Sequence, residues 1–343
     1  MIDVAPDRLS FSSSELIGVR DTTEVFGISS DGSRVAGISN FASSSNFEAT
    51  TWLSNSPSSG IGLGFGGSPI QLSAGLGAWD GGVVGSNAGV SDAFRWTAVS
   101  NDFQILPDTG GASEARDVSS SGSTIVGTSS DFGAVGGAVF WDSSGINQLN
   151  DPFGINSIAD AISPNAEFIG GEVDFFDAGT FETGTQAGVW SGVDFSDLTL
   201  LQELDSSNNL TRLLGQVNDV TDSGYAVGET LAGDAFIWHP SFDGINSPFL
   251  GAQNFDDWLL FETGLTLDTF STGLFSTSLV GINEDPFGNL NLALNGSDTI
   301  GGSSSSFVVT VSSAGVPEPS GGIVLFAAAM ISLINRRRTQ VTA

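Results

Sequence analysis

Apolar positions along this chain occur in short runs of Val, Ile, Phe and Ala, and Gly, Ser, Asn and Asp bound nearly every run. Sustained helical periodicity is hard to find before residue 321. Short runs of β-branched and aromatic residues between turn-forming residues are typical of strands. The pattern therefore predicts an all-β body.

A unit of about 45 residues repeats along this body. Its first half is two strand-like runs joined by a turn rich in Asp, Ser and Gly, a turn chemistry that favours a hairpin. Its second half is a small residue, an apolar pair and a tryptophan. The repeated tryptophans are Trp52, Trp96, Trp141, Trp190 and Trp238. The glycines expected to end the second strand are Gly37, Gly85, Gly127, Gly170 and Gly228.

A sixth, degenerate copy has its hairpin in residues 279–294 and its last strand in residues 306–311. One unit cannot bury its own aromatic residues, so neighbouring units must stack on it. Three or four strands per unit at this period predict a β-propeller of about six blades. Residues 9–22 are expected to supply a strand that closes the ring with the last blade, and seven blades would need a further N-terminal stretch.

The units resemble the HAF-type repeat of bacterial extracellular proteins, in which an Asn- or Ser-Asp-Gly hairpin ends in Val-Gly and Ala-Phe-x-Trp follows. Residues 105–111 match the Leu-rich linker of that repeat. The resemblance covers about residues 23–311 and implies an extracellular location, but most members of that family have no assigned activity. The departures are a shortened copy at residues 77–85 and insertions at 174–186 and 194–214.

The C-terminal tail combines an extended Pro motif, an apolar segment and a basic cluster. Residues 321–335 carry no charge, and as a helix they would be roughly 22 Å long at ~1.5 Å per residue. That length is short for a hydrocarbon core of about 30 Å, but a thinned bilayer accommodates it. The arginines after the segment predict a cytoplasmic C-terminus and a body outside the cytoplasm.

This tail resembles the PEP-CTERM sorting signal of Gram-negative bacteria. The matching motif is Pro317, Glu318 and Pro319, and the membrane stop signal is Arg336, Arg337 and Arg338. The resemblance implies that an exosortase recognises the motif in the inner membrane and removes the helix. An ordinary single-pass anchor would give the same topology without cleavage. Residues 1–7 do not resemble a signal peptide, so export predicts a start farther upstream or a trimmed N-terminus.

These features predict five parts of the chain. They are an N-terminal segment (1–22), the repeat domain (23–312), a linker with the Pro-Glu-Pro motif (313–320), a transmembrane helix (321–335) and a basic cytoplasmic tail (336–343).

The body is strongly acidic, because the chain has 39 Asp and Glu residues against nine Arg and no Lys, for a net charge of −30. Nucleic acid is not expected as a partner, since phosphate binding needs clustered Lys and Arg. The absence of cysteine excludes thiolate catalysis and Cys-bound metals. The 25 Phe and seven Trp residues are enough for a large core, so the acidity does not indicate disorder.

Candidate chemistry is sparse. His239 is the only histidine, and a polar strand end is a better explanation for it than a Ser-His-Asp triad. Asp256 and Asp257 form one of many carboxylate pairs that a glycosidase could use. Calcium is the one plausible cofactor, with weak candidates in Asp31, Asp222, Asp234 and Asp285, although turn roles explain these residues as well.

The sequence therefore predicts an exported surface or matrix protein with no catalytic residues, which acts by interaction, with extracellular polysaccharide as a candidate partner. Phe175, Phe176 and Phe181 lie in the longest insertion, where they could stack on sugar rings or pack internally. Two alternatives are a carboxylate-based glycan hydrolase or lyase and a calcium-dependent glycan-binding module. The hydrolase or lyase predicts a paired-carboxylate cleft at the mouth of the ring.

Overall fold

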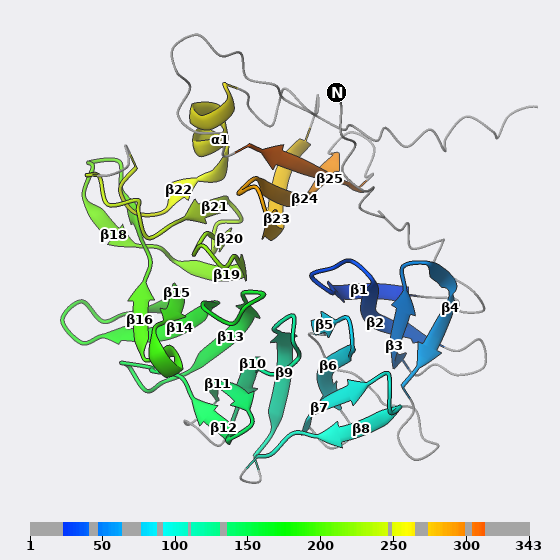
Figure 1. Cartoon of the computed structure of the whole chain (residues 1–343). Helices are drawn as coiled ribbons and strands as arrows, with labels where there is room; N and C mark the ends of the chain where they lie inside the picture. Colours follow the sequence, from blue (N-terminus) through cyan, green and yellow to red (C-terminus); the bar gives the residue numbers. More distant parts are fainter. Residues whose placement is uncertain are drawn as a thin grey trace, which may run out of the picture.

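Six antiparallel sheets follow one another along the chain and surround a common axis (Figure 1). The computed structural model describes residues 23–40, 47–63, 77–87, 92–108, 111–130, 136–245, 249–264, 274–298 and 304–312. In each sheet the strands pair in sequence order, so each blade is a simple meander. The protein is an all-β, six-bladed propeller, as the repeat predicts.

The first three blades contain four strands each. Blade 1 contains β1 (Thr23–Ile28), β2 (Arg34–Asn40), β3 (Phe47–Leu53) and β4 (Ser56–Gly62). Blade 2 contains β5 (Gly77–Trp79), β6 (Gly82–Asn87), β7 (Asp92–Thr97) and β8 (Asp102–Ile105). Blade 3 contains β9 (Ser113–Val118), β10 (Ile125–Ser129), β11 (Gly137–Asp142) and β12 (Gly145–Gln148).

The later blades carry the insertions. Blade 4 contains β13 (Ser157–Ile162), β14 (Ile169–Asp177), β15 (Glu182–Ser191) and β16 (Asp197–Leu200), with the short helix η1 (Val193–Phe195) before β16. A separate hairpin of β17 (Gln202–Leu204) and β18 (Leu210–Arg212) follows. Blade 5 contains β19 (Gly215–Val220), β20 (Ala226–Thr230), β21 (Ala235–Trp238) and β22 (Gln253–Asn254), and helix α1 (Phe255–Thr263) comes next. Blade 6 contains β23 (Leu274–Glu284), β24 (Leu290–Asp298) and β25 (Ser304–Val311).

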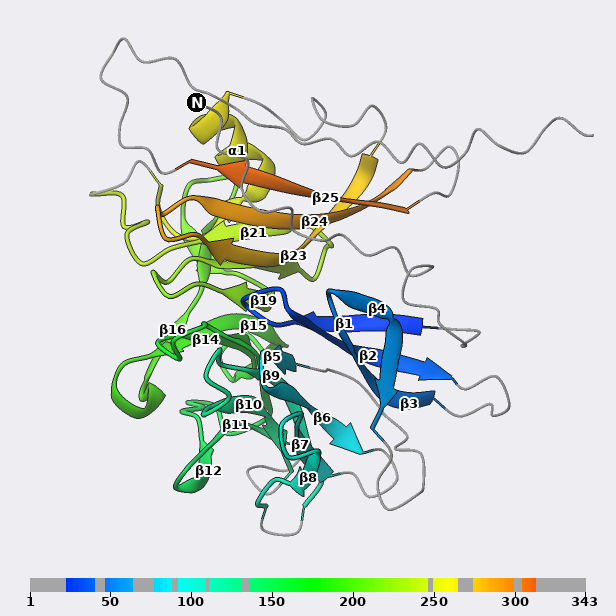
Figure 2. The same ribbon diagram turned by 45° about the vertical axis from the view of Figure 1, so that its right-hand side comes forward.

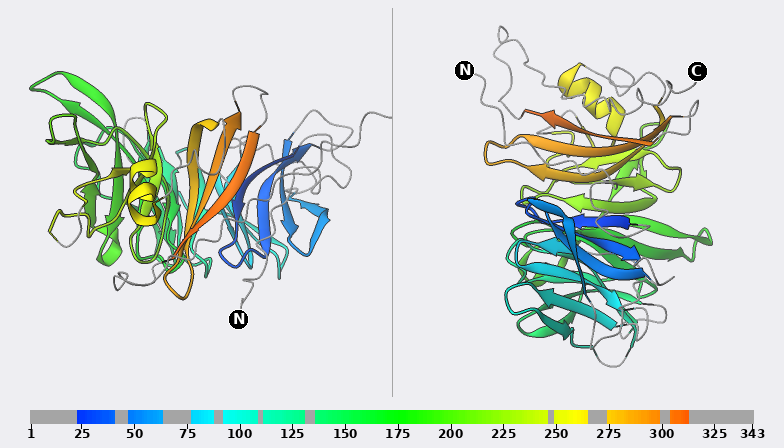
Figure 3. Two further views of the ribbon diagram at one scale, coloured as in Figure 1. Left: turned by 90° about the horizontal axis from the view of Figure 1, so that it is seen from above. Right: turned by 90° about the vertical axis from the view of Figure 1, so that its right-hand side faces the viewer.

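The first strand of each blade lies nearest the axis. Strands β5, β9, β13, β19 and β23 contact one another in that order, and β1 contacts β5. The remaining strands extend outward from the axis (Figures 1 and 2). Figure 3 shows the blades side by side, with their strands running roughly along the axis of the propeller.

The repeated tryptophans occupy one position of the blade, as the repeat predicts. Each lies in the third strand opposite an apolar residue of the second strand, for example Trp141 opposite Ile125. All five are buried. Trp141 donates its indole N–H to the carbonyl of Pro107 in the linker that leaves the preceding blade (2.8 Å), and Trp190 bonds Asn150 in the same way (2.7 Å). These two tryptophans thus fasten their blades to the preceding ones, whereas Trp96 donates to Asn101 of its own blade (3.2 Å).

The repeated glycines do not end the second strand, because the strand continues through them. Gly127 lies opposite a bulge in β9, where a side chain would clash with the carbonyl oxygen of Glu114. Gly228 faces the carbonyl of Gln216 in the same manner. In blade 4 the residue at this position is Gly171 and not Gly170, so the predicted position is wrong by one residue there. The glycine is required by close backbone approach.

Each bulge places one extra residue in an innermost strand. The irregularity recurs at corresponding positions in β1, β9, β13, β19 and β23. The extra residues are Phe26, Arg116, Asp160, Asn218 and Val280.

Two carboxylates next to these bulges link neighbouring blades. Asp117 accepts hydrogen bonds from the backbone N–H groups of Val118 and, in the next blade, Ile162 (2.9 Å). Asp219 accepts from Val220 and, in the next blade, Ile282 (2.8 Å). We term Asp117 and Asp219 the carboxylate latches. They join blade 3 to blade 4 and blade 5 to blade 6.

Helix α1 was not anticipated by the strand pattern. Asn254 caps it by accepting from the N–H groups of Asp256 and Asp257, and Gly264 ends it in the left-handed conformation. The predicted carboxylate pair is therefore the acidic first turn of a helix, where the helix dipole favours negative charge. The apolar side of α1 contacts residues of both blade 5 and blade 6.

The carboxylate latches predict that the fold is more stable in mild acid. Burial raises the pKa of Asp117 to about 6, and burial together with the charge of Asp117 raises the pKa of Asp219 to about 7. Because both values exceed those of the unfolded chain, the folded state binds more protons between about pH 4 and 7. The melting temperature should therefore rise as the pH falls from 8 to 5.

Asp219→Asn should flatten this pH profile, whereas Asp205→Asn, which alters an exposed turn carboxylate whose pKa is lowered, should leave it intact. Thermal melts of the three proteins at pH 8, 6.5 and 5 provide the measurement. A wild-type melting temperature that falls over this range would contradict the prediction.

Candidate functional site

The bulges bring charged side chains from blades 3 and 4 together near the axis. Arg116 donates to Asp160 through Nη1 (2.8 Å) and to Glu114 through Nη2 (3.3 Å). Arg116 and Asp160 are both extra bulge residues. With Glu172 of β14 these residues form what we term the axial cluster.

The axial cluster is incompletely paired within the described residues. Glu114 Oε1, Arg116 Nε and Asp160 Oδ2 are buried and lack hydrogen-bond partners there. Burial raises the pKa of Asp160, although Arg116 opposes the shift. Burial, followed by the charges of Asp160 and Asp174, raises the pKa of Glu172 to about 7. Near neutral pH Glu172 can therefore either donate or accept a proton, as a general acid or base must.

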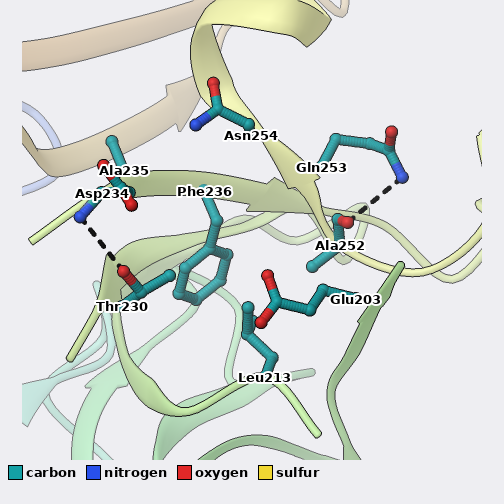
Figure 4. Close-up of a pocket in the computed structure, with 9 residues that line it drawn as sticks. All are labelled: Glu203, Leu213, Thr230, Asp234, Ala235, Phe236, Ala252, Gln253 and Asn254. Carbon is teal, nitrogen blue, oxygen red and sulfur yellow. Dashed lines mark hydrogen bonds between the residues drawn. The ribbon is translucent and has the colours of Figure 1, made fainter. Parts of the chain in front are cut away.

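Two further carboxylates line a small pocket between strand β17 and blade 5 (Figure 4). Leu213, Phe236 and Ala252 contribute apolar side chains to its lining, and Glu203 and Asp234 contribute the carboxylates. Burial and the charge of Asp234 raise the pKa of Glu203. The cavity is about 70 Å³, whereas pockets for small organic ligands measure about 300–1,000 Å³. It has room for a few water molecules rather than a sugar ring.

A third feature is the long hairpin of β14 and β15 in blade 4, which extends away from the ring (green in Figure 3). Phe176 and Phe181 at its end are 47% and 79% exposed, and their rings meet edge to face with centroids 6.4 Å apart. We term this pair the aromatic tip. Phe175, in contrast, is buried, and Arg212 lies over its ring at 4.5 Å. Of the three phenylalanines predicted to lie in the insertion, Phe176 and Phe181 are therefore exposed and Phe175 is packed internally.

The turn that carries the aromatic tip has a strained backbone and is stabilised by hydrogen bonds to one carboxylate. Phe181 has a φ of 59°, in the left-handed region that bulky residues rarely adopt. Asp177 Oδ1 accepts from the N–H groups of Gly179 and Thr180, and its other oxygen accepts from Arg212 (3.2 Å). These hydrogen bonds lower the pKa of Asp177. A glycine would fit at position 181 with less strain, so the phenylalanine there is consistent with a role outside folding.

The four calcium candidates lie in separate turns and do not come together. Asp31 accepts from Ser29 and Ser33, and Asp285 accepts from the N–H groups of Phe287 and Asn289. Asp222 accepts from the backbone of Asn165 in the preceding blade (2.7 Å), and Asp234 lines the pocket. Within the described ranges, no three Asp, Glu or His residues form a group that could hold a metal ion. Calcium binding stays a prediction.

His239 lies at the end of β21, as expected. Its Nε2 is 3.1 Å from the backbone carbonyl of Ser223, which identifies Nε2 as the protonated nitrogen, and its Nδ1 accepts from Ser241 (2.7 Å for the hydroxyl). The ring lies beside Tyr225 at 4.2 Å. Burial lowers the pKa of His239. These contacts orient the histidine through a backbone carbonyl and not through a carboxylate, so they do not reproduce a Ser-His-Asp triad.

The sorting motif (317–319), the arginine cluster (336–338) and the predicted transmembrane helix (321–335) lie outside the described residues. The part of the chain that the structure describes contains no helix long and apolar enough to span a membrane.

Comparisons with known proteins yield only structural similarity, at low sequence identity. No protein-family model and no curated protein matches the chain. Among solved structures, it resembles the β-propeller domain of the trilobed protease from Pyrococcus furiosus, with 10% identity, a TM-score of 0.49, and coverage of 85% of this chain and 78% of that one.

Two further structures show weaker similarity. TolB from Acinetobacter baumannii has 11% identity and a TM-score of 0.41, over 63% of this chain and 51% of that one. A prolyl endopeptidase structure has 9% identity and a TM-score of 0.39, over 88% and 52%. This chain thus spans about half the length of each. The class is therefore defined by the sheet topology, which is that of a six-bladed propeller.

The axial cluster predicts a stability defect that a second substitution partly repairs. Arg116→Met should leave Asp160 and Glu114 as unpaired buried carboxylates and lower the free energy of unfolding by about 2 kcal/mol, less than the ~3–5 kcal/mol typical of fully buried pairs because the site is partly exposed. Arg116→Met combined with Asp160→Asn should recover part of the loss. Urea unfolding at pH 7 measures both, and equal losses in the single and double variants would contradict the pairing.

Proposed function

We propose that this protein is an exported, non-enzymatic surface or matrix protein that binds neutral extracellular polysaccharide through the aromatic tip. The observation that supports this proposal most directly is the exposed pair Phe176 and Phe181, held at the end of an extended hairpin in a conformation unfavourable for phenylalanine. Aromatic faces stack on the apolar C–H faces of sugar rings, and edge-to-face rings present both a face and an edge to a ligand.

Charge limits the ligand class. The chain carries a net charge of −30, so anionic polymers are repelled at short range unless divalent cations bridge them. Arg212, which contacts this hairpin, is already paired with Asp177 and Glu182. A neutral polysaccharide avoids this repulsion.

Location rests on the sequence motifs. We propose that an exosortase in the inner membrane recognises Pro317–Pro319 and that the mature protein is released to the cell surface or matrix. The HAF-like repeats across the propeller support the same location, because that repeat occurs in extracellular proteins.

A glycan hydrolase or lyase is the second candidate, favoured by one observation. Glu172, with its pKa near 7, lies beside Asp160 and Asp174, an arrangement that would suit a general acid with a carboxylate partner. Incubation with a panel of polysaccharides tests it: sugar release that is lost in Glu172→Gln would establish the enzyme and overturn the non-enzymatic proposal.

The aromatic tip predicts a variant that loses binding without losing stability. Phe181→Gly should relieve the left-handed strain and so not lower the melting temperature, while weakening binding to dextran, amylose or cellulose about tenfold, equivalent to ~1.4 kcal/mol. Affinity electrophoresis and thermal melts measure the two effects. Phe287→Ala, which removes an equally exposed phenylalanine from a turn in blade 6, is the control and should retain binding. Unchanged binding by Phe181→Gly would refute the role of the aromatic tip.

Processing predicts a shorter mature chain. Intact-mass analysis of protein recovered from the native cell surface should show a C-terminus near residue 319 and no Arg336–Arg338. Recovery of these arginines in the mature protein would indicate a retained anchor instead. Replacing Pro317 and Pro319 by Ala should leave the precursor unprocessed in the membrane fraction.

A further inference from the structure

The two faces of the β14–β15 hairpin differ in what covers them. Side chains alternate between the faces along each strand. Val173 and Phe175, on one face, are buried, because residues of blade 3 and the guanidinium of Arg212 pack against them. Phe176 lies on the other face and is 47% exposed. We term this second face the open face of the hairpin.

The open face carries a line of polar groups that leads from the aromatic tip toward the axis. Glu172, Asp174 and Phe176 follow one another at intervals of two residues, so they share this face. Four residues of strand span about 14 Å at ~3.4 Å per residue. Exposure rises outward along the line: Gly170 lies against Val217 of blade 5, Glu172 and Asp174 are half-buried, and Phe176 is exposed.

Strand β15 adds hydroxyl groups to the same face. Its register places Thr183 opposite Phe176 and Thr185 opposite Asp174. Thr185 donates to Oδ1 of Asp174 (2.7 Å), and the side-chain amide of Asn156 donates to Oδ2 (3.3 Å). These two bonds fix the orientation of the carboxylate. Because an ionised carboxylate can accept about four hydrogen bonds, Asp174 keeps acceptor capacity within the described residues.

This combination of groups matches a glycan. A sugar ring offers an apolar C–H face to an aromatic side chain and hydroxyl donors to a fixed acceptor. The residues of the open face include two carboxylates, Glu172 and Asp174, and no cation, so an anionic polymer would be repelled there. An apolar partner would bury Asp174 without supplying it with donors, which costs free energy.

We propose that a neutral glycan lies along the open face from the aromatic tip to Asp174, and that Asp174 determines specificity by accepting hydrogen bonds from hydroxyl groups of the sugar next to the one stacked on the tip. This extended site rests on the polysaccharide binding proposed above and gives it a chemical selectivity. It favours glycans with free hydroxyl groups over their O-methylated forms. The site ends at Glu172, because blade 5 covers the open face beyond that residue.

Asp174→Asn tests the assignment, because it keeps the shape of the side chain and removes its charge. Affinity electrophoresis in gels that contain dextran, soluble amylose or hydroxyethylcellulose measures binding. The variant should bind about fivefold more weakly than wild type to the polymer that retains wild type, which is the difference between a charged and a neutral acceptor. Glu182→Gln is the matched control: it removes an exposed carboxylate from the same hairpin but outside the open face, and should bind within twofold of wild type.

O-methylated polymer separates specificity from a merely structural effect. Wild type should bind the methylated form of its polymer at least fivefold more weakly than the unmodified form, because methylation removes the hydroxyl donors. In Asp174→Asn this ratio should shrink to about twofold. A general loss of structure would weaken both forms alike and leave the ratio unchanged, and thermal melts of both variants should stay near wild type.

The outcomes also distinguish this site from the function on which it rests. Loss of binding in Phe181→Gly, with unchanged binding and an unchanged methylation ratio in Asp174→Asn, would overturn the extended site and leave the aromatic tip in place. A wild-type protein that none of the three polymers retains, or unchanged binding in Phe181→Gly, would overturn the polysaccharide function and the extended site together.

Discussion

Contact between neighbouring blades is the constraint on which this fold depends. No blade has a core of its own: the buried clusters combine residues of adjacent blades, as where Trp79 and Val84 of blade 2 meet Val118 and Trp141 of blade 3. Stability is therefore the sum of many similar interfaces. The same dependence explains the repeated tryptophan, which supplies a large apolar surface and, in Trp141 and Trp190, an N–H that reaches the preceding linker.

This packing brings the backbones of the inner strands close together near the axis. The close approach determines where polar groups lie. Each bulge adds a residue to an innermost strand, and the glycine or small residue opposite admits a carbonyl. Some extra residues are charged, so Arg116 and Asp160 meet between blades. The carboxylate latches occupy the neighbouring position. Charge is thus concentrated near the axis, where burial raises the pKa of Asp117 and Asp219 and links blade contacts to pH.

The repeat allowed the fold to be predicted because its signals are local. The spacing of Trp52 to Trp238 and the Ser- and Asp-rich turns identify three strands of each unit without knowledge of their partners. The role of the repeated glycines could not be predicted, since the carbonyl that excludes a side chain at Gly127 comes from a different strand. Helix α1 was missed because it is short, although Asn254 and Gly264 are recognisable caps. The axial cluster was missed because its members come from two blades and are adjacent only in space.

Residues that match the repeat pack between neighbouring blades. A binding surface is therefore better sought in the insertions that depart from the repeat. The extended hairpin of blade 4 is such a departure: its inner part pairs like any other blade, while its end adds Phe176 and Phe181 outside every blade contact. Phe175, one residue away, is packed against Arg212, which shows that burial was available to an aromatic residue at this end of the hairpin. Two aromatic residues that are in contact with each other and exposed at the end of one hairpin are consistent with contact with an uncharged partner.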